Sequence, residues 1–190
     1  RGRLRSLGLD EDVSAGTFHA QAYAALRARW ADRRVRPPTV LDRRGRILHR
    51  VLPRSLAAAD RLAVQTEIDW ATARRVSPDN YPAAAERAGR IIGVGVSQVA
   101  EHYRGFVDEK ARLRHVDFDD LLELCIQAMG DPEYARARHW RHRYVFVDEF
   151  QDVNPRQYQL LRSWLGPEST LCVVGDPSQA IYGWNGADAA

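Results

Sequence analysis

The stretch 144–188 constrains the fold of this 190-residue chain more than any other part of it. It contains two short apolar runs, Tyr144–Val147 and Thr170–Val174, which are rich in β-branched and aromatic residues. Runs of this length and composition are typical of buried strands. Between them, Asn154 can cap a helix, Pro155 suits its first turn, and later apolar residues recur at helical spacing. This order predicts a βαβ unit whose two strands are parallel and adjacent or nearly so.

Acidic residues follow both predicted strands. Asp148 and Glu149 follow the first strand, and Asp176 follows the second. Because ligands bind beyond the carboxyl ends of the strands in an open parallel sheet, we expect these carboxylates at one binding edge. Carboxylates there can hold a hydrated Mg²⁺ and orient a water molecule, as phosphoryl transfer requires. Acidic residues also end strands as ordinary turn or cap residues, and that alternative stays open for either strand alone.

Two longer motifs at this edge carry a family resemblance. Asp148–Asp152 (DEFQD) resembles the Walker B segment of UvrD/Rep/PcrA-type superfamily 1 DNA helicases, and Gly175–Trp184 (GDPSQAIYGW) resembles the family's next motif. The resemblance implies an α/β fold, namely part of the parallel sheet of a RecA-like P-loop NTPase with an all-helical inserted subdomain. Asn185 stands where the family usually has Arg, so the contact of that Arg with DNA or phosphate is not implied here.

The same resemblance implies roles for single residues. Asp148 would hold Mg²⁺ through water, Glu149 would orient or deprotonate the water that attacks the γ-phosphate of ATP, and Gln179 would contact that phosphate. Tyr182 and Trp184 would stack on bases of single-stranded DNA, because stacking on aromatic rings tolerates any base sequence. Packing beside the sheet is the alternative for these two aromatic side chains.

A shorter match lies nearer the start of the chain. Gly16–His19 (GTFH) resembles the family's Thr-Phe-His motif, which lies beside the single-stranded DNA path. Thr17 and His19 can each hydrogen-bond a phosphate oxygen. The alternative for this triplet alone is that Thr17 caps a helix and His19 packs against the sheet. We expect a short strand over Val13–Phe18, followed by an amphipathic helix that extends toward Pro37.

The expected domain organisation has three parts. Residues 1–35 and 114–190 are expected to belong to the RecA-like motor domain 1A. Residues 36–113 are expected to form a helical insertion, which is similar to the family's subdomain 1B in position and helical character. We expect helices that begin at Asp42 and at Ser55, and no strand in this part.

The segment after the insertion returns to the motor domain. Asp117 is expected to cap a helix, with Phe118 and the leucines that follow it in the core. Residues 136–143 are expected to form a short basic connector. Cys125 and Cys172 are expected to be buried thiols in a reducing compartment, because both lie in apolar segments.

Composition and charge restrict the class of protein. The chain is 45% hydrophobic and 28% charged, which is typical of a soluble globular protein. No apolar run is long enough to span a membrane and no signal peptide opens the chain, so we expect a cytoplasmic protein without a membrane partner. Residues 1–54 carry a strong excess of Arg, which is a candidate surface for the phosphate backbone of DNA. An Arg-rich composition throughout, with Lys110 as the only Lys, is an equal alternative.

The resemblance implies a fragment of an ATP-dependent 3′–5′ DNA helicase or translocase. Such a motor couples the hydrolysis of ATP, with Mg²⁺, to the unwinding of duplex DNA in repair or replication, and it binds single-stranded DNA and duplex junctions. No GxxxxGK[ST] loop occurs in these residues, so we expect the piece alone to be inactive without a Walker A loop and a second motor domain. The alternative is a truncated, non-motor module that binds single-stranded DNA or a partner.

Overall fold

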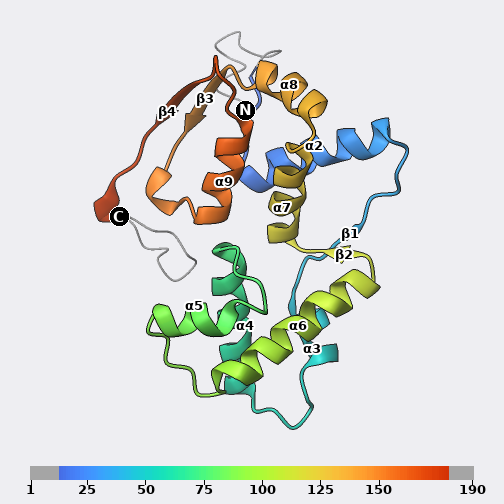
Figure 1. The fold of residues 1–190 in the computed structure, drawn as a ribbon, viewed down its shortest axis with the longest axis vertical. Helices are drawn as coiled ribbons and strands as arrows, with labels where there is room; N and C mark the ends of the chain where they lie inside the picture. The colour runs from blue at the N-terminus through green and yellow to red at the C-terminus, as the bar shows by residue number, and fades with distance from the viewer. Residues whose placement is uncertain (1–12, 180–190) are drawn as a thin grey trace.

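The computed structural model describes residues 13–179, apart from the side chains of Trp140 and Arg141. These residues form two lobes (Figure 1). The upper lobe in Figure 1 contains α2 (Phe18–Asp32), α7 (Phe118–Ala128), α8 (Pro132–Arg141), β3 (Tyr144–Val147), η1 (Phe150–Asp152), α9 (Pro155–Trp164), β4 (Thr170–Val173) and η2 (Pro177–Gln179). The lower lobe contains α3 (Gly45–Val51), α4 (Ala58–Ala73), α5 (Tyr81–Arg87) and α6 (Val96–Arg112). The short strands β1 (Thr39–Val40) and β2 (His115–Val116) run between the lobes.

The predicted βαβ unit is confirmed. β3 and β4 are parallel neighbours, and their register pairs Tyr144 with Thr170 and Val147 with Val173. α9 connects them and begins with a capping box, in which the Asn154 side chain accepts the backbone N–H of Gln157 at 2.9 Å. Helices and short parallel strands are thus mixed along the chain, as an α/β fold requires.

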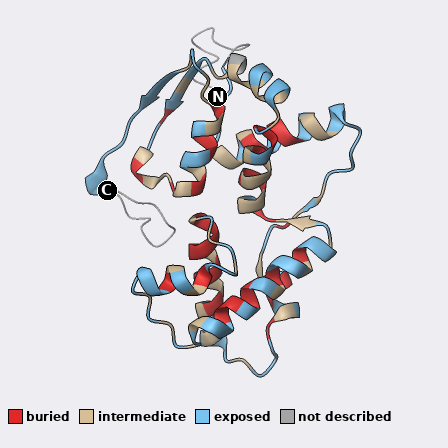
Figure 2. Ribbon diagram, viewed as in Figure 1, coloured by how far each residue is buried: buried red, intermediate tan, exposed pale blue. Residues whose placement is uncertain are grey.

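The predicted burial of these strands is wrong for β4 and for one face of β3, whereas Val147 on the other face of β3 is buried. Tyr144 and Phe146 are 65% and 78% exposed, and every residue of β4 is exposed (Figure 2). Cys172 in β4 is therefore an exposed thiol, whereas Cys125 in α7 is buried as expected. Hydrophobic composition identified the strands correctly, but burial also needs a neighbouring layer. Within residues 13–179, the outer face of this strand pair has no such layer.

The upper lobe contains a second capping box, at the start of α7. Asp117 accepts the backbone N–H of Asp120 at 3.0 Å, and its own N–H donates to the Asp120 carboxylate at 2.8 Å. This confirms the predicted start of α7. α7 packs against α2 and α9. The buried core of this lobe consists of Ala22, Ala25, Leu26, Leu121, Leu122, Cys125, Ala128, Met129, Leu160 and Trp164.

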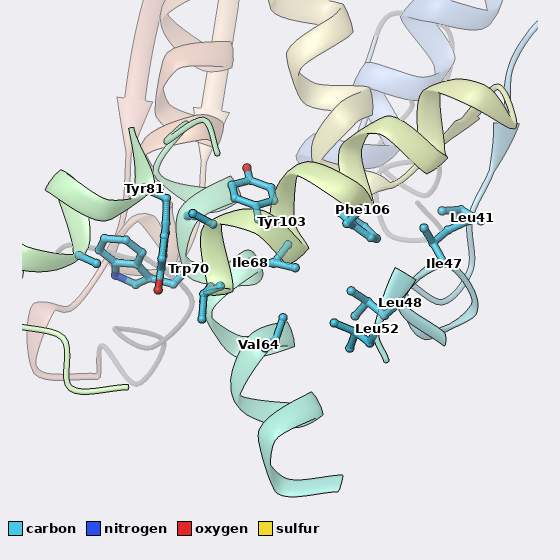
Figure 3. Packing of buried hydrophobic residues seen from close by; sticks show 14 residues of the cluster. Leu41, Ile47, Leu48, Leu52, Val64, Ile68, Trp70, Tyr81, Tyr103 and Phe106 are labelled. Carbon is cyan, nitrogen blue, oxygen red and sulfur yellow. The ribbon is translucent and has the colours of Figure 1, made fainter. Parts of the chain in front are cut away.

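The lower lobe is helical, as expected, and has its own core. Figure 3 shows this cluster, in which the ring of Tyr81 meets Trp70 edge-on, with ring centroids 6.3 Å apart. The Tyr81 hydroxyl donates to buried Glu67 at 2.8 Å. Val64, Ile68 and Phe106 fill the contact between α4 and α6. The domain boundaries at residues 35/36 and 113/114 remain a prediction, which the two separate cores support.

Several predicted boundaries are wrong because contacts distant in sequence override local signals. Residues 13–17 form no strand, and α2 ends at Asp32, before Pro37. Thr39–Val40 is a strand because it pairs with His115–Val116, which local sequence does not reveal. Consequently α3 begins at Gly45 rather than at Asp42.

Three further helices differ from the expectation. α4 starts after Ala57, and Ser55 does not cap it. α5 follows the turn at residues 78–80 and was not predicted. The basic segment 136–143 lies largely in α8, because Asp131 caps this helix and Pro132 occupies its first turn. No helix among residues 13–179 is long and apolar enough to cross a membrane.

Buried charges join the two lobes. Lys110, at the end of α6, donates to Asp117 at 2.7 Å and to Asp120 at 2.5 Å, and its side chain is 6% exposed. Arg44 also pairs with Asp117, at 3.1 Å through Nε, and with Asp119 of α7. The N-terminus of α7 is therefore held by two cations of the lower lobe.

A second link lies close to the first. Arg156 of α9 is buried and donates from Nε to the Thr72 carbonyl of α4 at 2.7 Å. Its Nη1 also contacts Glu123 of α7 at 3.2 Å. Because buried polar groups of this kind are costly when unpaired, the network favours a defined arrangement of the two lobes.

Candidate functional site

The predicted acidic edge exists. The ladder between β3 and β4 continues past the strands, with hydrogen bonds from Val174 N–H to the Val147 carbonyl at 2.8 Å and from Phe150 N–H to the Val174 carbonyl at 2.9 Å. Asp148 and Glu149 therefore leave β3 at the same end of the pair at which Asp176 follows β4. All three side chains belong to exposed residues, so ligands can reach them from solvent.

Glu149 has an unusual backbone. Its φ of 52° and ψ of 44° lie in the left-handed region, which non-glycine residues adopt at a cost and which often marks functional sites. This conformation turns the chain from β3 into η1. The Asp148 carboxylate supports the turn, because it accepts the Glu149 N–H at 3.0 Å.

Asp176 organises the second part of the edge. One carboxylate oxygen accepts the backbone N–H of Ser178 at 2.9 Å and its hydroxyl at 2.7 Å, while the other accepts Nε2 of Gln179 at 2.9 Å. The hydrogen bonds from Ser178, followed by the one from Gln179, lower the pKa of Asp176 below its ordinary value. Asp176 therefore holds the side chain of Gln179, the residue expected to contact the γ-phosphate.

The edge suits the water-mediated magnesium contact expected of Asp148. Among the described residues, no group of three His, Cys, Asp or Glu side chains is placed to hold a metal ion. Mg²⁺ does not need such a cage, because it keeps several waters and uses one or two carboxylates together with substrate phosphates. The exposed carboxylate of Asp148, which has a second oxygen besides the one that accepts the Glu149 N–H, fits this type of site.

The residues of the GTFH motif lie at the start of α2. Thr17 caps this helix by accepting the Ala20 N–H at 3.2 Å. Its hydroxyl hydrogen is still able to donate to a phosphate oxygen. His19 is half-buried and meets Phe118, not the sheet, with ring centroids 5.7 Å apart and an interplanar angle of 82°. Burial lowers the pKa of His19, so the imidazole is neutral at pH 7 and has one N–H to donate.

A cavity of about 610 Å³ lies at the junction of the two lobes and includes His19 in its wall. Phe118 also lines it and is 52% exposed, so the prediction that Phe118 belongs to the core is wrong. Phe118 shares a helix face with Leu121 and Leu122, but it is the first residue of α7, and its ring meets His19 at the cavity instead of the core. Charged and polar groups complete the wall, namely Asp42, Arg43, Arg44, Gln65, Asp69, Asp117, Asp119, Asn154 and Gln157.

The acidic edge and the cavity are linked by one short segment. Glu149 belongs to the edge, η1 follows it directly, and Asn154 at the start of α9 lines the cavity. Thr17 is not among the cavity-lining residues. Tyr182, Trp184 and Asn185 lie outside the described residues, so their predicted stacking stays a prediction.

Sequence alone assigned one residue of the site wrongly and left another without a defined role. Phe118 was assigned to the core because it begins an apolar helix face. Gln151, like Asp152, was expected to support the network around Glu149 and Gln179 in an undefined role, and it is buried between Glu149 and Asp176. The signal for Gln151 was its place inside the DEFQD motif, and the signal for Phe118 was its position at the exposed first turn of a helix.

Comparisons with known proteins agree with these motifs. A family model described as the UvrD/REP helicase N-terminal domain matches residues 1–190. The chain is 36% identical over 204 residues to the ATP-dependent DNA helicase UvrD2 of Mycobacterium tuberculosis and of Mycobacterium bovis, covering 98% of this chain and 29% of each relative. It is 41% identical over 91 residues to the ATP-dependent DNA helicase PcrA of Staphylococcus epidermidis, covering 47% of this chain and 12% of that relative.

The matches cover different shares of this chain and of its relatives. The chain spans less than a third of the length of the curated relatives it matches. The family model, in contrast, covers every residue of the chain. The chain therefore belongs to the UvrD/REP helicase N-terminal domain family.

Proposed function

We propose that this chain is part of the first motor domain of an ATP-dependent DNA helicase or translocase. The observation that carries the proposal is the common edge of β3 and β4, where Asp148 and Glu149 follow one strand and Asp176, which binds Gln179, follows the other. We further propose that the strand pair belongs to a RecA-like P-loop sheet and that the intact motor works in the cytoplasm, in repair or replication. Movement from 3′ to 5′ on single-stranded DNA is part of the same proposal.

In this proposal the residues of the edge have separate roles in ATP hydrolysis. Glu149 orients the attacking water and accepts its proton, and Gln179 contacts the γ-phosphate. Asp148 would hold Mg²⁺ through water, and the bound ion would supply charge stabilisation to the transferring phosphoryl group. No GxxxxGK[ST] loop occurs in these 190 residues, so the proposal assigns the cradling of the phosphates to another part of the intact protein.

The cavity between the lobes supports a path for single-stranded DNA. The half-exposed ring of Phe118 offers a surface on which a base can stack. His19 and Arg43 in the same wall are donors suited to phosphate oxygens. We propose that the path for single-stranded DNA also includes Thr17, Tyr182 and Trp184. The intact protein would in addition bind duplex junctions.

The test of the proposed function is ATP hydrolysis by the intact protein and by the 190-residue chain, side by side. We expect hydrolysis that single-stranded DNA stimulates in the intact protein and none in the shorter chain. If both the intact protein and the shorter chain bind single-stranded DNA but hydrolyse no ATP, the motor proposal is contradicted and a non-motor binding module is favoured.

Replacing Phe118 by Ala is expected to weaken single-stranded DNA binding by about 1–3 kcal/mol, the range for loss of one stacked base. The fold should persist, because the ring is outside the core of α7. Fluorescence anisotropy of a labelled oligothymidine with the intact protein measures the change. Tyr23→Ala is the matched control, since Tyr23 is an exposed aromatic residue of α2 that does not line the cavity. Equal losses in the two variants would remove Phe118 from the proposed DNA path.

A further inference from the structure

Gln151 connects the two halves of the acidic edge. It is 7% exposed, although η1, to which it belongs, starts directly after exposed Glu149. Its Nε2 donates to Oε2 of Glu149 at 2.6 Å, and its Oε1 accepts the backbone N–H of Asp176 at 3.0 Å. The orientation of the amide follows from its partners, because a backbone N–H can only donate and an ionised carboxylate can only accept.

The contact between Gln151 and the segment after β4 is tight. A Cβ atom on Gly175 would lie 2.5 Å from Oε1 of Gln151, and 3.0 and 3.1 Å from the backbone nitrogens of Phe150 and Gln151. A side chain at position 175 would therefore displace the Gln151 amide and crowd the backbone of η1. Gly175 is needed here for close approach, so η1 and the end of β4 are fitted to one another.

The hydrogen bonds continue from Gln151 to Gln179. Asp176, whose N–H is bound by Gln151, accepts Nε2 of Gln179 on its carboxylate at 2.9 Å. A continuous path thus runs from Glu149 through Gln151 and Asp176 to Gln179. Its two ends are the residues proposed to act on the attacking water and on the γ-phosphate.

We propose that Gln151 is a positioning residue that holds the Glu149 carboxylate and couples its position to the segment that carries Gln179. The inference rests on the proposed function, because it assigns a role within ATP hydrolysis. The Glu149 side chain is exposed, so the hydrogen bond from the buried Gln151 amide at 2.6 Å restricts the orientation of its carboxylate. When the γ-phosphate binds or leaves at Gln179, the shift of Asp176 moves the Gln151 amide and with it Glu149.

The first test is Gln151→Met in the intact protein. Met preserves the volume of the side chain but makes neither hydrogen bond. We expect kcat for DNA-stimulated ATP hydrolysis to fall by about 10²-fold, the effect of a small misplacement of a reacting group. KM for ATP should change by less than about threefold, because Gln151 acts on the chemical step rather than on substrate binding. Gln159→Met is the matched control on the exposed surface of α9, and its kinetics should equal those of the unsubstituted protein.

The second test is Gln151→Glu in the intact protein. A purely structural role of Gln151 would not predict the pH dependence of turnover that we expect for this variant. This side chain still accepts the Asp176 N–H but places a second carboxylate against Glu149. Two adjacent carboxylates raise the pKa of one of them, and the proton they then share restores a donor between the two side chains. Relative to the unsubstituted protein, turnover should therefore be low near neutral pH and recover as the pH is lowered.

The outcomes separate the two proposals. Full turnover in Gln151→Met, with Glu149→Gln inactive, would overturn the role of Gln151 and leave the proposed function in place. An unsubstituted intact protein that shows no DNA-stimulated hydrolysis would overturn the proposed function and this inference together. If Gln151→Met does not fold, the pH profile of Gln151→Glu decides, and a profile parallel to that of the unsubstituted protein overturns the inference.

Discussion

Replacing Glu149 by Gln in the intact protein is expected to reduce DNA-stimulated ATP hydrolysis by about 10²–10⁴-fold, the usual contribution of a general base. Gln has the same shape and can still accept the hydrogen bond that Gln151 donates to position 149. It is unable to take a proton from water. Single-stranded DNA affinity should be unchanged, because Glu149 lies at the end of β3 and not in the cavity wall.

Steady-state ATP hydrolysis with saturating single-stranded DNA measures this effect, and anisotropy with a labelled oligonucleotide measures DNA binding. Glu168→Gln is the matched control, because Glu168 is an exposed carboxylate in the loop before β4. Its turnover should equal that of the unsubstituted protein. Normal turnover by the Glu149→Gln variant would contradict the role assigned to Glu149.

Replacing Lys110 by Met is expected to lower the free energy of unfolding of the chain by about 3–5 kcal/mol, as when one partner of a buried ion pair is removed. Asp117 is 2% exposed and Lys110 is 5% exposed, so water is unable to replace the lost partner. Arg44 remains beside Asp117 at 3.1 Å, which favours the lower end of the range. Urea unfolding followed by circular dichroism measures the change.

Arg112→Met is the matched control for this prediction. Arg112 pairs with Glu109 at 2.7 Å on the same helix, but its side chain is 63% exposed. Exposed pairs contribute about 0–1 kcal/mol, so the control should unfold almost like the unsubstituted chain. Equal destabilisation by the two substitutions would contradict the role of burial.

The same network predicts a dependence on acid. Burial opposes the ionisation of Asp117, but Arg44 and then Lys110 outweigh it and lower the pKa of Asp117 to about 2. A carboxylate with a lowered pKa stabilises the fold above its unfolded pKa of about 3.9. This contribution is lost as the pH falls from there through about 2. The Lys110→Met variant should lose less stability over this pH range, because the pKa of Asp117 is lowered less when Lys110 is absent.

Local sequence determined the elements of the site. Tyr144–Val147 and Thr170–Val173 are strands because of their β-branched and aromatic residues, and the capping boxes at Asn154 and Asp117 start α9 and α7 as predicted. Caps and periodicity act between residues close in the chain. The parallel order of the strands followed from the helix between them, and the common acidic edge followed from that order.

Which faces are covered and which distant groups meet depends instead on how the elements pack in three dimensions. Phe118 looks like a core residue in sequence, yet it lines a cavity because the other lobe does not close over it. Gln151 meets Asp176, and Lys110 meets Asp117, through chain turns that no local pattern encodes. The physical reason is that strand and helix signals depend on near neighbours, whereas burial and the pairing of buried charges depend on how separate elements pack in space.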